Sequence, residues 1–148
     1  VNKKAVVLGY GGASKAIVYS LLKEGFDEIK IYNRTLKKTK KLKNIKTISL
    51  IKKNEIKDSL KKTDIVINTT PVNVLSSLGI KKINNILAFD IVYSPKETSF
   101  LSHFKKSNRI YGISMLIYQA IPCFEDWFGV RPKIDKGILM LLNKALKK

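Results

Sequence analysis

Small residues cluster near the start of the chain in a pattern that suits the binding of a phosphate group. Gly9, Gly11 and Gly12 follow a short apolar run and stand just before Ala13 and Ser14. Small residues between a strand and a helix let the backbone approach a pyrophosphate, whose charge is attracted by the free N–H groups of the helix. The pattern predicts a dinucleotide site, although Ser14 stands where this fingerprint usually has Gly or Ala.

The residues about 20 positions after the first glycine favour one kind of dinucleotide. NAD-binding domains usually carry a carboxylate there, which binds the ribose hydroxyls, whereas this chain has Asn33, Arg34 and Thr35. A carboxylate would repel a 2′-phosphate, and the guanidinium group of Arg34 can donate hydrogen bonds to one. Lys38 adds a positive charge one helical turn after Arg34. The segment therefore predicts NADP rather than NAD.

Other reactive side chains are few. His103 is the only histidine, and the stretch from Leu101 to Lys106 has the pattern of a surface helix, so His103 is not expected to act as a catalyst. Cys123 is the only cysteine; it stands among apolar residues of a predicted helix and is expected to be buried rather than reactive. One His and one Cys cannot make a zinc site, so no metal is expected.

The elements that must position these residues alternate along the chain. Apolar runs predict six strands, at residues 4–8, 28–32, 46–50, 64–68, 86–90 and 107–111. Helical patterns and capping signals predict five helices, at residues 14–24, 36–43, 54–60, 113–128 and 134–146. The alternation predicts a Rossmann-like α/β fold, with a doubly wound, mostly parallel six-stranded sheet and helices on both faces. The length of 148 residues suits a single domain.

Finer features of three of these helices can also be predicted. Gly25 is expected to end the first helix, and Asn54 to cap the third. In the helix at 113–128, Tyr118 and Trp127 are expected to pack against the protein rather than stack on a ligand, and Asp126 to be a solvated charge.

Charge and composition narrow the classes of function. The formal net charge is +18, from 29 Lys and Arg against 11 Asp and Glu. Only Arg34, Arg109 and Arg131 are arginines, whereas proteins that read DNA bases rely on Arg. A solvated lysine surface is therefore favoured over a specific nucleic-acid partner. The chain has no apolar run of about 18 residues. Together with the single cysteine, this predicts a cytoplasmic protein without a membrane partner.

Five motifs, in order along nearly the whole chain, resemble those of the shikimate dehydrogenase family. They are residues 9–16, residues 33–35 with Lys38, residues 64–71, residues 90–95 with Thr98, and residues 112–129. The resemblance implies reversible hydride transfer between NADPH and 3-dehydroshikimate, in aromatic amino-acid biosynthesis. Asn73 and Ser114 depart from the family pattern, which often has Gly at those positions.

The resemblance also implies roles for single positions. The glycine loop would hold the pyrophosphate, the second motif the 2′-phosphate, and later residues would border the ribose and the nicotinamide. The implied cofactor-binding residues are Gly9, Gly11, Gly12, Ala13, Asn33, Arg34, Thr35, Lys38, Thr69, Thr70, Ile91 and Gly112. Tyr93 and Gln119 would reach the substrate, Gln119 through hydrogen bonds to its hydroxyl groups.

Members of this family have a second, N-terminal domain that carries a Ser-x-Ser substrate motif and a catalytic Lys–Asp pair. Neither is recognised between residues 1 and 148, and Val1 stands where the second domain of the family would begin. The chain is therefore expected to be the NADP-binding domain, residues 1–148, with no catalytic residue of its own. In the family, the C-terminal helix packs back on the partner domain.

Alternative functions stay open. Quinate/shikimate dehydrogenases share most of these motifs and some prefer NAD, although Arg34 argues against NAD here. Glutamyl-tRNA reductase has a related NADP domain, but the motifs around Tyr93 and Gln119 favour the shikimate group. A non-catalytic basic module that binds dinucleotides or nucleic acid is a third possibility, supported by the charge and by the missing catalytic domain.

Overall fold

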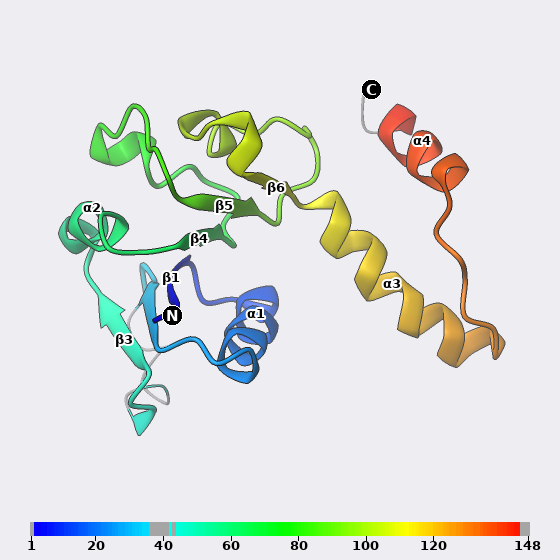
Figure 1. Ribbon diagram of the computed structural model, residues 1–148, viewed down its shortest axis with the longest axis horizontal. Coiled ribbons are helices and arrows are strands. Elements are labelled where there is room, and N and C mark those ends of the chain that lie inside the picture. The colour runs from blue at the N-terminus through cyan, green and yellow to red at the C-terminus, as the bar shows by residue number, and fades with distance from the viewer. Residues whose placement is uncertain (1, 36–41, 43, 146–148) are drawn as a thin grey trace.

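The computed structural model describes residues 2–35, 42 and 44–145 of the chain (Figure 1). Its centre is a six-stranded sheet in which every neighbouring pair of strands is parallel. The strands are β1 (Lys4–Leu8), β2 (Glu28–Tyr32), β3 (Ile48–Ile51), β4 (Ile65–Asn68), β5 (Leu87–Asp90) and β6 (Arg109–Tyr111). Their order across the sheet is β3-β2-β1-β4-β5-β6, so the direction of winding reverses between β1 and β4. The predicted α/β fold class is confirmed.

Helices and short turns connect the strands. The α-helices are α1 (Gly12–Lys23), α2 (Ile56–Leu60), α3 (Ile113–Phe128) and α4 (Lys136–Ala145). Short 3-10 turns lie at Lys53–Glu55, Ser76–Leu78, Leu101–His103 and Lys106–Asn108. None of the helices in the described ranges is long and apolar enough to cross a membrane.

Two apolar clusters, one on each face of the sheet, form the core. Val6 and Leu8 of β1 belong to the cluster that includes α2, whereas Ala5 and Val7 belong to the cluster that includes α1. All four residues are at most 1% exposed. A central strand buried on both faces explains why β1 is a continuous apolar run rather than an alternating one. Packing on both faces fixes the positions of the strands, and so of the loops that follow their carboxyl ends.

Several predicted boundaries can be compared directly with the structure. Gly25 has a φ of +71° just after α1, as expected for a helix-ending glycine. Asn54 does not cap α2: a 3-10 turn at Lys53–Glu55 precedes that helix, and the Lys52 N–H donates to Glu55 Oε2 at 2.6 Å. The carboxylate of Glu55 therefore caps the 3-10 turn, while α2, whose N-cap position is Glu55, has no side-chain cap. The predicted helix at 36–43 lies almost wholly outside the described residues.

The prediction that His103 lies on a surface helix was wrong. Only Leu101–His103 forms a 3-10 turn, and His103 is 8% exposed. Its Nδ1 lies 3.0 Å from the carbonyl oxygen of Lys81, so this nitrogen must carry the proton. Nε2 lies 3.0 Å from the Asn73 amide nitrogen and 3.2 Å from the Ser76 hydroxyl oxygen. The imidazole has the structural role of tying two loops together.

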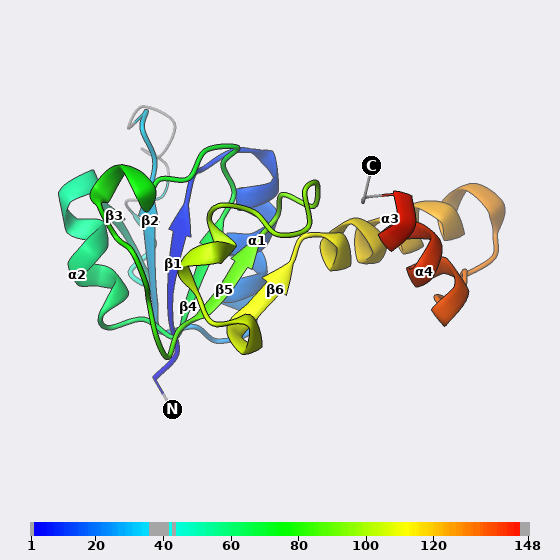
Figure 2. The same cartoon turned by 90° about the horizontal axis from the view of Figure 1, so that it is seen from above.

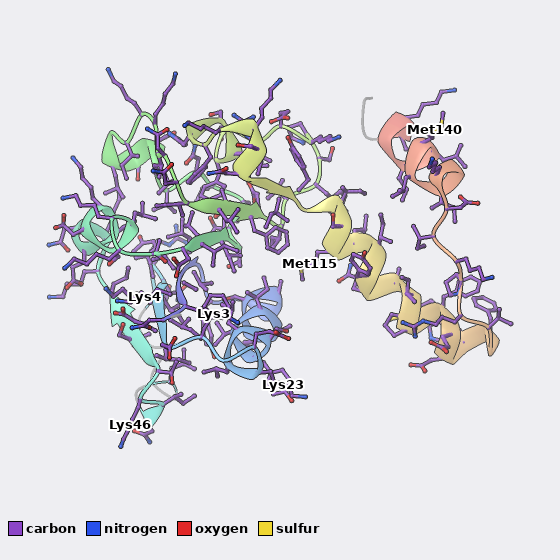
Figure 3. All side chains as sticks on the ribbon, viewed as in Figure 1. Lys3, Lys4, Lys23, Lys46, Met115 and Met140 are labelled. Carbon is purple, nitrogen blue, oxygen red and sulfur yellow. The ribbon has the colours of Figure 1, made fainter. Side chains whose placement is uncertain are left out.

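Helix α3 begins beside β6 and then leaves the sheet, and α4 lies beyond it (Figures 1 and 2). Met115 lies near the sheet and Met140 far from it on α4 (Figure 3). The expectation that Tyr118 and Trp127 pack was wrong, because they are 72% and 77% exposed and no described element covers them. Cys123 is likewise exposed rather than buried. Asp126 is exposed, as expected.

Candidate functional site

The chain makes a tight turn at Gly9, directly after β1. Gly9 has a φ of +100°, and its N–H donates to the carbonyl oxygen of Tyr32 at 2.7 Å. A Cβ atom at this position would lie 2.6 Å from Thr69 Oγ1 and 2.7 Å from Thr70 Cγ2. Both the backbone conformation and the close approach of the loop after β4 therefore require glycine here.

Gly11 and Gly12 differ from Gly9, because a Cβ atom on either would meet no other atom within 4 Å. Internal packing therefore does not explain why these positions are small. Gly11 is the N-cap residue of α1; its residue type offers no capping side chain, and the first turn of the helix carries no acidic residue. An open approach to an uncapped helix N-terminus fits an anionic group such as a pyrophosphate.

Ser14 holds this turn together. Its side chain is fully buried, and its hydroxyl donates to the carbonyl oxygen of Gly9 at 2.9 Å. A glycine or alanine at this third fingerprint position could not form that bond. The departure from the usual pattern is therefore compensated by an added link between α1 and the end of β1.

Asn33 connects the glycine turn with the segment that follows β2. Its Oδ1 accepts from the Tyr10 N–H at 3.2 Å, and its Nδ2 donates to the carbonyl oxygen of Thr35 at 2.7 Å. Arg34 and Thr35 are exposed beside it, and Lys38 lies outside the described residues. The position of Asn33 was predicted as part of the site, but its bridging contacts could not be foreseen from the sequence.

Three adjoining pockets follow the carboxyl ends of the strands. A pocket of about 320 Å³ lies between residues 9–11, residues 32–35 and residues 69–72. A second pocket, of about 420 Å³, shares residues 69–71 with the first and is also lined by residues 91–94. The third, of about 190 Å³, shares Ile91 and Tyr93 with the second.

The three pockets bring together nearly all of the predicted site residues. Their lining includes Gly9, Gly11, Ala13, Asn33, Arg34, Thr35, Thr69, Thr70, Ile91, Tyr93, Gly112 and Gln119. Gly12 is adjacent to them in α1. The pockets lie where the winding of the sheet reverses, which is where open α/β sheets bind ligands.

Gly112 has a packing role that the sequence did not indicate. A Cβ atom there would collide with the carbonyl oxygen of Ile91, and would lie 2.6 Å from the carbonyl carbon of Ile91 and 2.7 Å from the carbonyl oxygen of Asp90. Only glycine lets the start of α3 lie so close to the segment after β5. The approach places Gln119, further along α3, beside the third pocket.

Sequence reasoning missed the buried polar residues behind these pockets. Asn68 and Asp90 end β4 and β5 and are 2% and 1% exposed, and Thr98 is 8% exposed. Burial raises the pKa of the Asp90 carboxyl group, although hydrogen bonds from Thr98, the Val92 N–H and Asn68 oppose that effect. The signal that could have found them is a polar residue at the end of a buried apolar strand.

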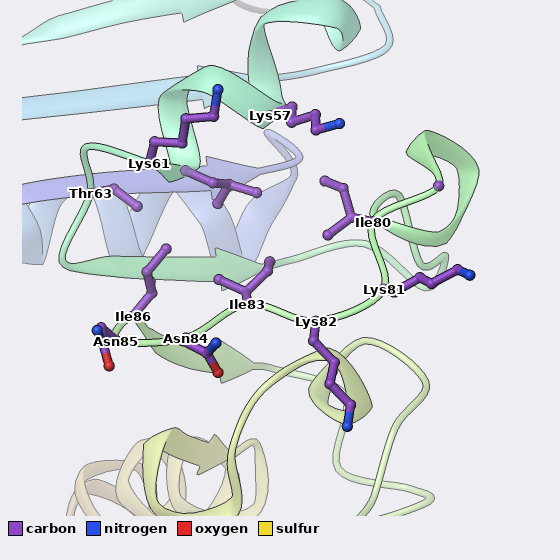
Figure 4. Close-up of a pocket in the computed structure, with 12 residues that line it drawn as sticks. Lys57, Lys61, Thr63, Ile80, Lys81, Lys82, Ile83, Asn84, Asn85 and Ile86 are labelled. Atoms are coloured by element: carbon purple, nitrogen blue, oxygen red, sulfur yellow. The ribbon is translucent and has the colours of Figure 1, made fainter.

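A larger pocket lies elsewhere, between α2 and residues 79–86 (Figure 4). Its volume is about 610 Å³, and Ile80, Ile83 and Ile86 form much of its wall. The side chains of Lys81 and Lys82 project away from it (Figure 4). It lies beside the segments that lead into β4 and β5, away from the carboxyl ends of the strands where open α/β sheets bind ligands, so size alone does not make it the stronger candidate. Within the described ranges, no group of three or more His, Cys, Asp or Glu residues could hold a metal ion.

A parallel, doubly wound sheet with an open glycine turn at its switch point defines the class of this protein. These are the features of a Rossmann-type dinucleotide-binding domain.

Comparisons with known proteins identify the family. The sequence profile described as "Shikimate / quinate 5-dehydrogenase" matches residues 1–93. A "Shikimate dehydrogenase (NADP(+))" from Bartonella quintana (strain Toulouse) is 33% identical over 152 residues, which cover 93% of this chain and 52% of that protein. The chain therefore belongs to the shikimate/quinate 5-dehydrogenase family, and it spans about half the length of the curated relatives it matches.

Solved structures agree with this assignment. The crystal structure of shikimate dehydrogenase from Aquifex aeolicus matches with a TM-score of 0.73 and 29% identity, over 95% of this chain and 53% of that one. Quinate dehydrogenase from Corynebacterium glutamicum, solved in complex with NAD, matches with a TM-score of 0.78 over 100% of this chain and 56% of that one. At 20% identity, the second match supports the fold alone.

Proposed function

We propose that residues 1–148 are the NADP-binding domain of a shikimate dehydrogenase, which reversibly reduces 3-dehydroshikimate to shikimate with NADPH in aromatic amino-acid biosynthesis. The observation that carries this proposal is the open turn at Gly11 and Gly12, which leads directly to the N-terminus of α1 in a chain of this family. Relatives over nearly the whole chain are named as NADP-dependent shikimate dehydrogenases, which supports the same function.

The first pocket supports the choice of NADP over NAD. Arg34 and Thr35 line it, and no acidic residue stands among its described lining residues. A 2′-phosphate there would meet a guanidinium group rather than a carboxylate, and charge-assisted hydrogen bonds of this kind are strong. Lys38 as a second cation stays a prediction.

The other residues would act along the same row of pockets. The N–H groups at the start of α1 would bind the pyrophosphate, and Thr69 and Thr70 would border the ribose next to the nicotinamide. Ile91 and the backbone of Gly112 would pack near the nicotinamide ring, and Tyr93 and Gln119 would contact the substrate. Bound NADPH would supply the hydride. No residue of the chain is assigned a catalytic role, because the Lys–Asp pair belongs to the other domain of the family.

The exposed apolar surface of α3, α4 and the segment between them supports a partner domain. Its exposed side chains include Tyr118, Phe124, Trp127, Phe128, Val130, Met140 and Leu141. A surface patch of this kind is more typical of an interface than of a free surface. The remaining half of the relatives' length, which would hold the catalytic domain, would cover it. The cytoplasmic location and the lack of a specific nucleic-acid partner also stay predictions.

The test is a titration of the 148-residue chain with NADPH and with NADH, followed by nicotinamide fluorescence. We expect tighter binding of NADPH, and we expect Arg34→Ala to weaken NADPH about 10- to 100-fold, the value of a hydrogen-bonded charge, while leaving NADH unchanged. Arg131→Ala is the matched control, because Arg131 is an exposed arginine paired with Glu125 far from the pockets.

Two results would contradict this proposal. Equal affinity for NADPH and NADH would overturn the role of Arg34 and favour a quinate dehydrogenase with relaxed cofactor use. No binding of either nucleotide would contradict the cofactor-domain assignment, and a basic module would then be tested by the salt dependence of DNA binding.

A further inference from the structure

Two buried polar side chains face each other behind the nucleotide pockets. Asn68 ends β4 and Asp90 ends β5, and the two residues are direct partners in the parallel register of these strands. The Asn68 amide nitrogen donates to Asp90 Oδ1 at 3.1 Å. Burying a carboxylate at a strand end costs free energy that hydrogen bonds must offset, whereas an apolar residue could fill the same space without that cost.

Asn68 holds the loop after β4. Its Nδ2 also donates to the carbonyl oxygen of Thr70 at 2.9 Å. Its Oδ1 lies 3.2 Å from the Thr70 nitrogen and 2.8 Å from the Thr70 hydroxyl. That hydroxyl is also 2.8 Å from the carbonyl oxygen of Val72, so its single proton serves one acceptor at a time. One amide side chain thus fixes the backbone that lines the first and second pockets.

Asp90 holds the loop after β5 in a corresponding way. Its Oδ1 accepts from the Val92 N–H at 3.1 Å, and its Oδ2 accepts from the Thr98 hydroxyl at 2.6 Å. The Thr98 oxygen in turn accepts from the Leu101 N–H at 3.1 Å. No described buried side-chain nitrogen or oxygen lacks a partner, so each buried polar atom of the network has at least one hydrogen bond. Satisfied buried networks of this kind fix one arrangement of the segments that they join.

We propose that Asn68, Asp90 and Thr98 form a positioning unit that sets the loop after β4 against the loop after β5, and thereby aligns the nicotinamide half of the cofactor with the substrate. None of the three lines the three adjoining pockets, so they act through Thr70 and Val92, which both line the second pocket. This role rests on the proposed NADPH site. Asn68, Asp90 and Thr98 lie within the motifs of the family, but outside the residues expected to contact the cofactor.

If these residues position the two loops, a change in them should weaken binding of the nicotinamide half of the cofactor but not of the adenosine half. Adenosine 2′,5′-bisphosphate reaches only the 2′-phosphate and adenosine end, beside Arg34, whereas NADPH also extends to the loop after β5. Thr98→Val removes the hydroxyl with little change of shape. We expect it to weaken the affinity for NADPH about tenfold, which corresponds to the loss of one hydrogen bond. The affinity for the bisphosphate should change by less than about twofold.

Two further variants separate positioning from loss of stability. Thr98→Ser keeps the hydroxyl and should restore NADPH binding. Thr63→Val makes the same substitution at a half-buried threonine just before β4, at the opposite end of that strand, where its hydroxyl can donate to the carbonyl oxygen of Lys4 or of Ile65. This control should leave the affinity for both ligands unchanged. Equal weakening of both ligands by Thr98→Val, or no weakening of either, would overturn the proposal.

Amide hydrogen exchange without nucleotide gives an independent readout. Thr98→Val should speed exchange of the Thr70 and Val92 amides, which lie on the two loops, while exchange in β2 stays unchanged. Unaltered exchange at both amides would overturn the coupling even if the chain binds NADPH. If exchange changes as expected but the wild-type chain binds neither ligand, the positioning of the loops stands and the assignment of the NADPH site fails.

Discussion

Gly11→Ala should separate ligand binding from folding within a single loop. The added methyl group would meet no atom within 4 Å, and the φ of −95° and ψ of −161° suit alanine as well as glycine. Stiffening the unfolded chain contributes about 0.4–1 kcal/mol in favour of the folded state. The poorer N-cap quality of alanine opposes this by a similar amount, roughly 0.5–1 kcal/mol. The free energy of unfolding should therefore change by less than about 1 kcal/mol.

The affinity for NADPH should respond quite differently. The methyl group would occupy the open space through which a pyrophosphate approaches the N–H groups at the start of α1. Losing one hydrogen bond to a charged group costs about 1.5–3 kcal/mol, which corresponds to roughly 10- to 150-fold weaker binding. A variant that folds normally and binds poorly is therefore expected.

The assay pairs thermal unfolding with the NADPH titration, and Gly9→Ala is the comparison in the same loop. Gly9 combines a φ of +100° with a Cβ position only 2.6 Å from Thr69 Oγ1, so its alanine variant should lose about 1–3 kcal/mol of stability. Wild-type affinity in Gly11→Ala would refute the placement of the pyrophosphate. A large loss of stability in that variant would refute the distinction between the two glycines.

Two further predictions concern the segments behind the site. Gly112→Ala should lower the free energy of unfolding by about 1–3 kcal/mol or more, because its Cβ would meet the backbone of Ile91, which cannot rotate away; urea unfolding measures this loss. The hydrogen bond from Tyr111, and then the contact with Arg109, lower the pKa of Glu97 from its usual 4.5. This stabilisation is present above pH 4.5 and is lost as the pH falls through the lowered pKa, so Glu97→Gln should flatten the acid side of the stability profile in thermal unfolding scans. An unchanged acid side in that variant would exclude Glu97 as a source of the acid sensitivity.

The fold could be predicted where local patterns and tertiary structure agree. The apolar run of β1 predicts a buried strand, and both faces of β1 are indeed covered. Gly25 was predicted to end α1, and its positive φ suits a residue without Cβ. The prediction that Asn54 caps α2 was wrong because a 3-10 turn at Lys53–Glu55 precedes the helix, which moves the N-cap position to Glu55 and leaves it without a side-chain cap.

The sequence predicted which positions would lie together around the pockets but not their contacts, and their roles in binding stay predictions. The glycine turn and Arg34 come together as expected, because parallel strands bring their carboxyl ends to one edge. The bridging amide of Asn33 and the burial of His103 depend on segments far apart in the sequence, which no local pattern can reveal. The exposure of Trp127 was missed for another reason, since its apolar pattern is typical of packing and the described chain holds no partner for it.

Helix α3 joins two parts of the molecule that serve different purposes. Its first residues lie against the third pocket, while Trp127, near its other end, belongs to the exposed apolar surface. Sixteen residues make the helix about 24 Å long. A tilt of about 10° at its base would move its far end by about 4 Å, a figure that follows from the helical rise. A partner domain bound at Trp127 would therefore act on the geometry at Gln119 through this helix, with Pro122 as the one interruption between the two positions.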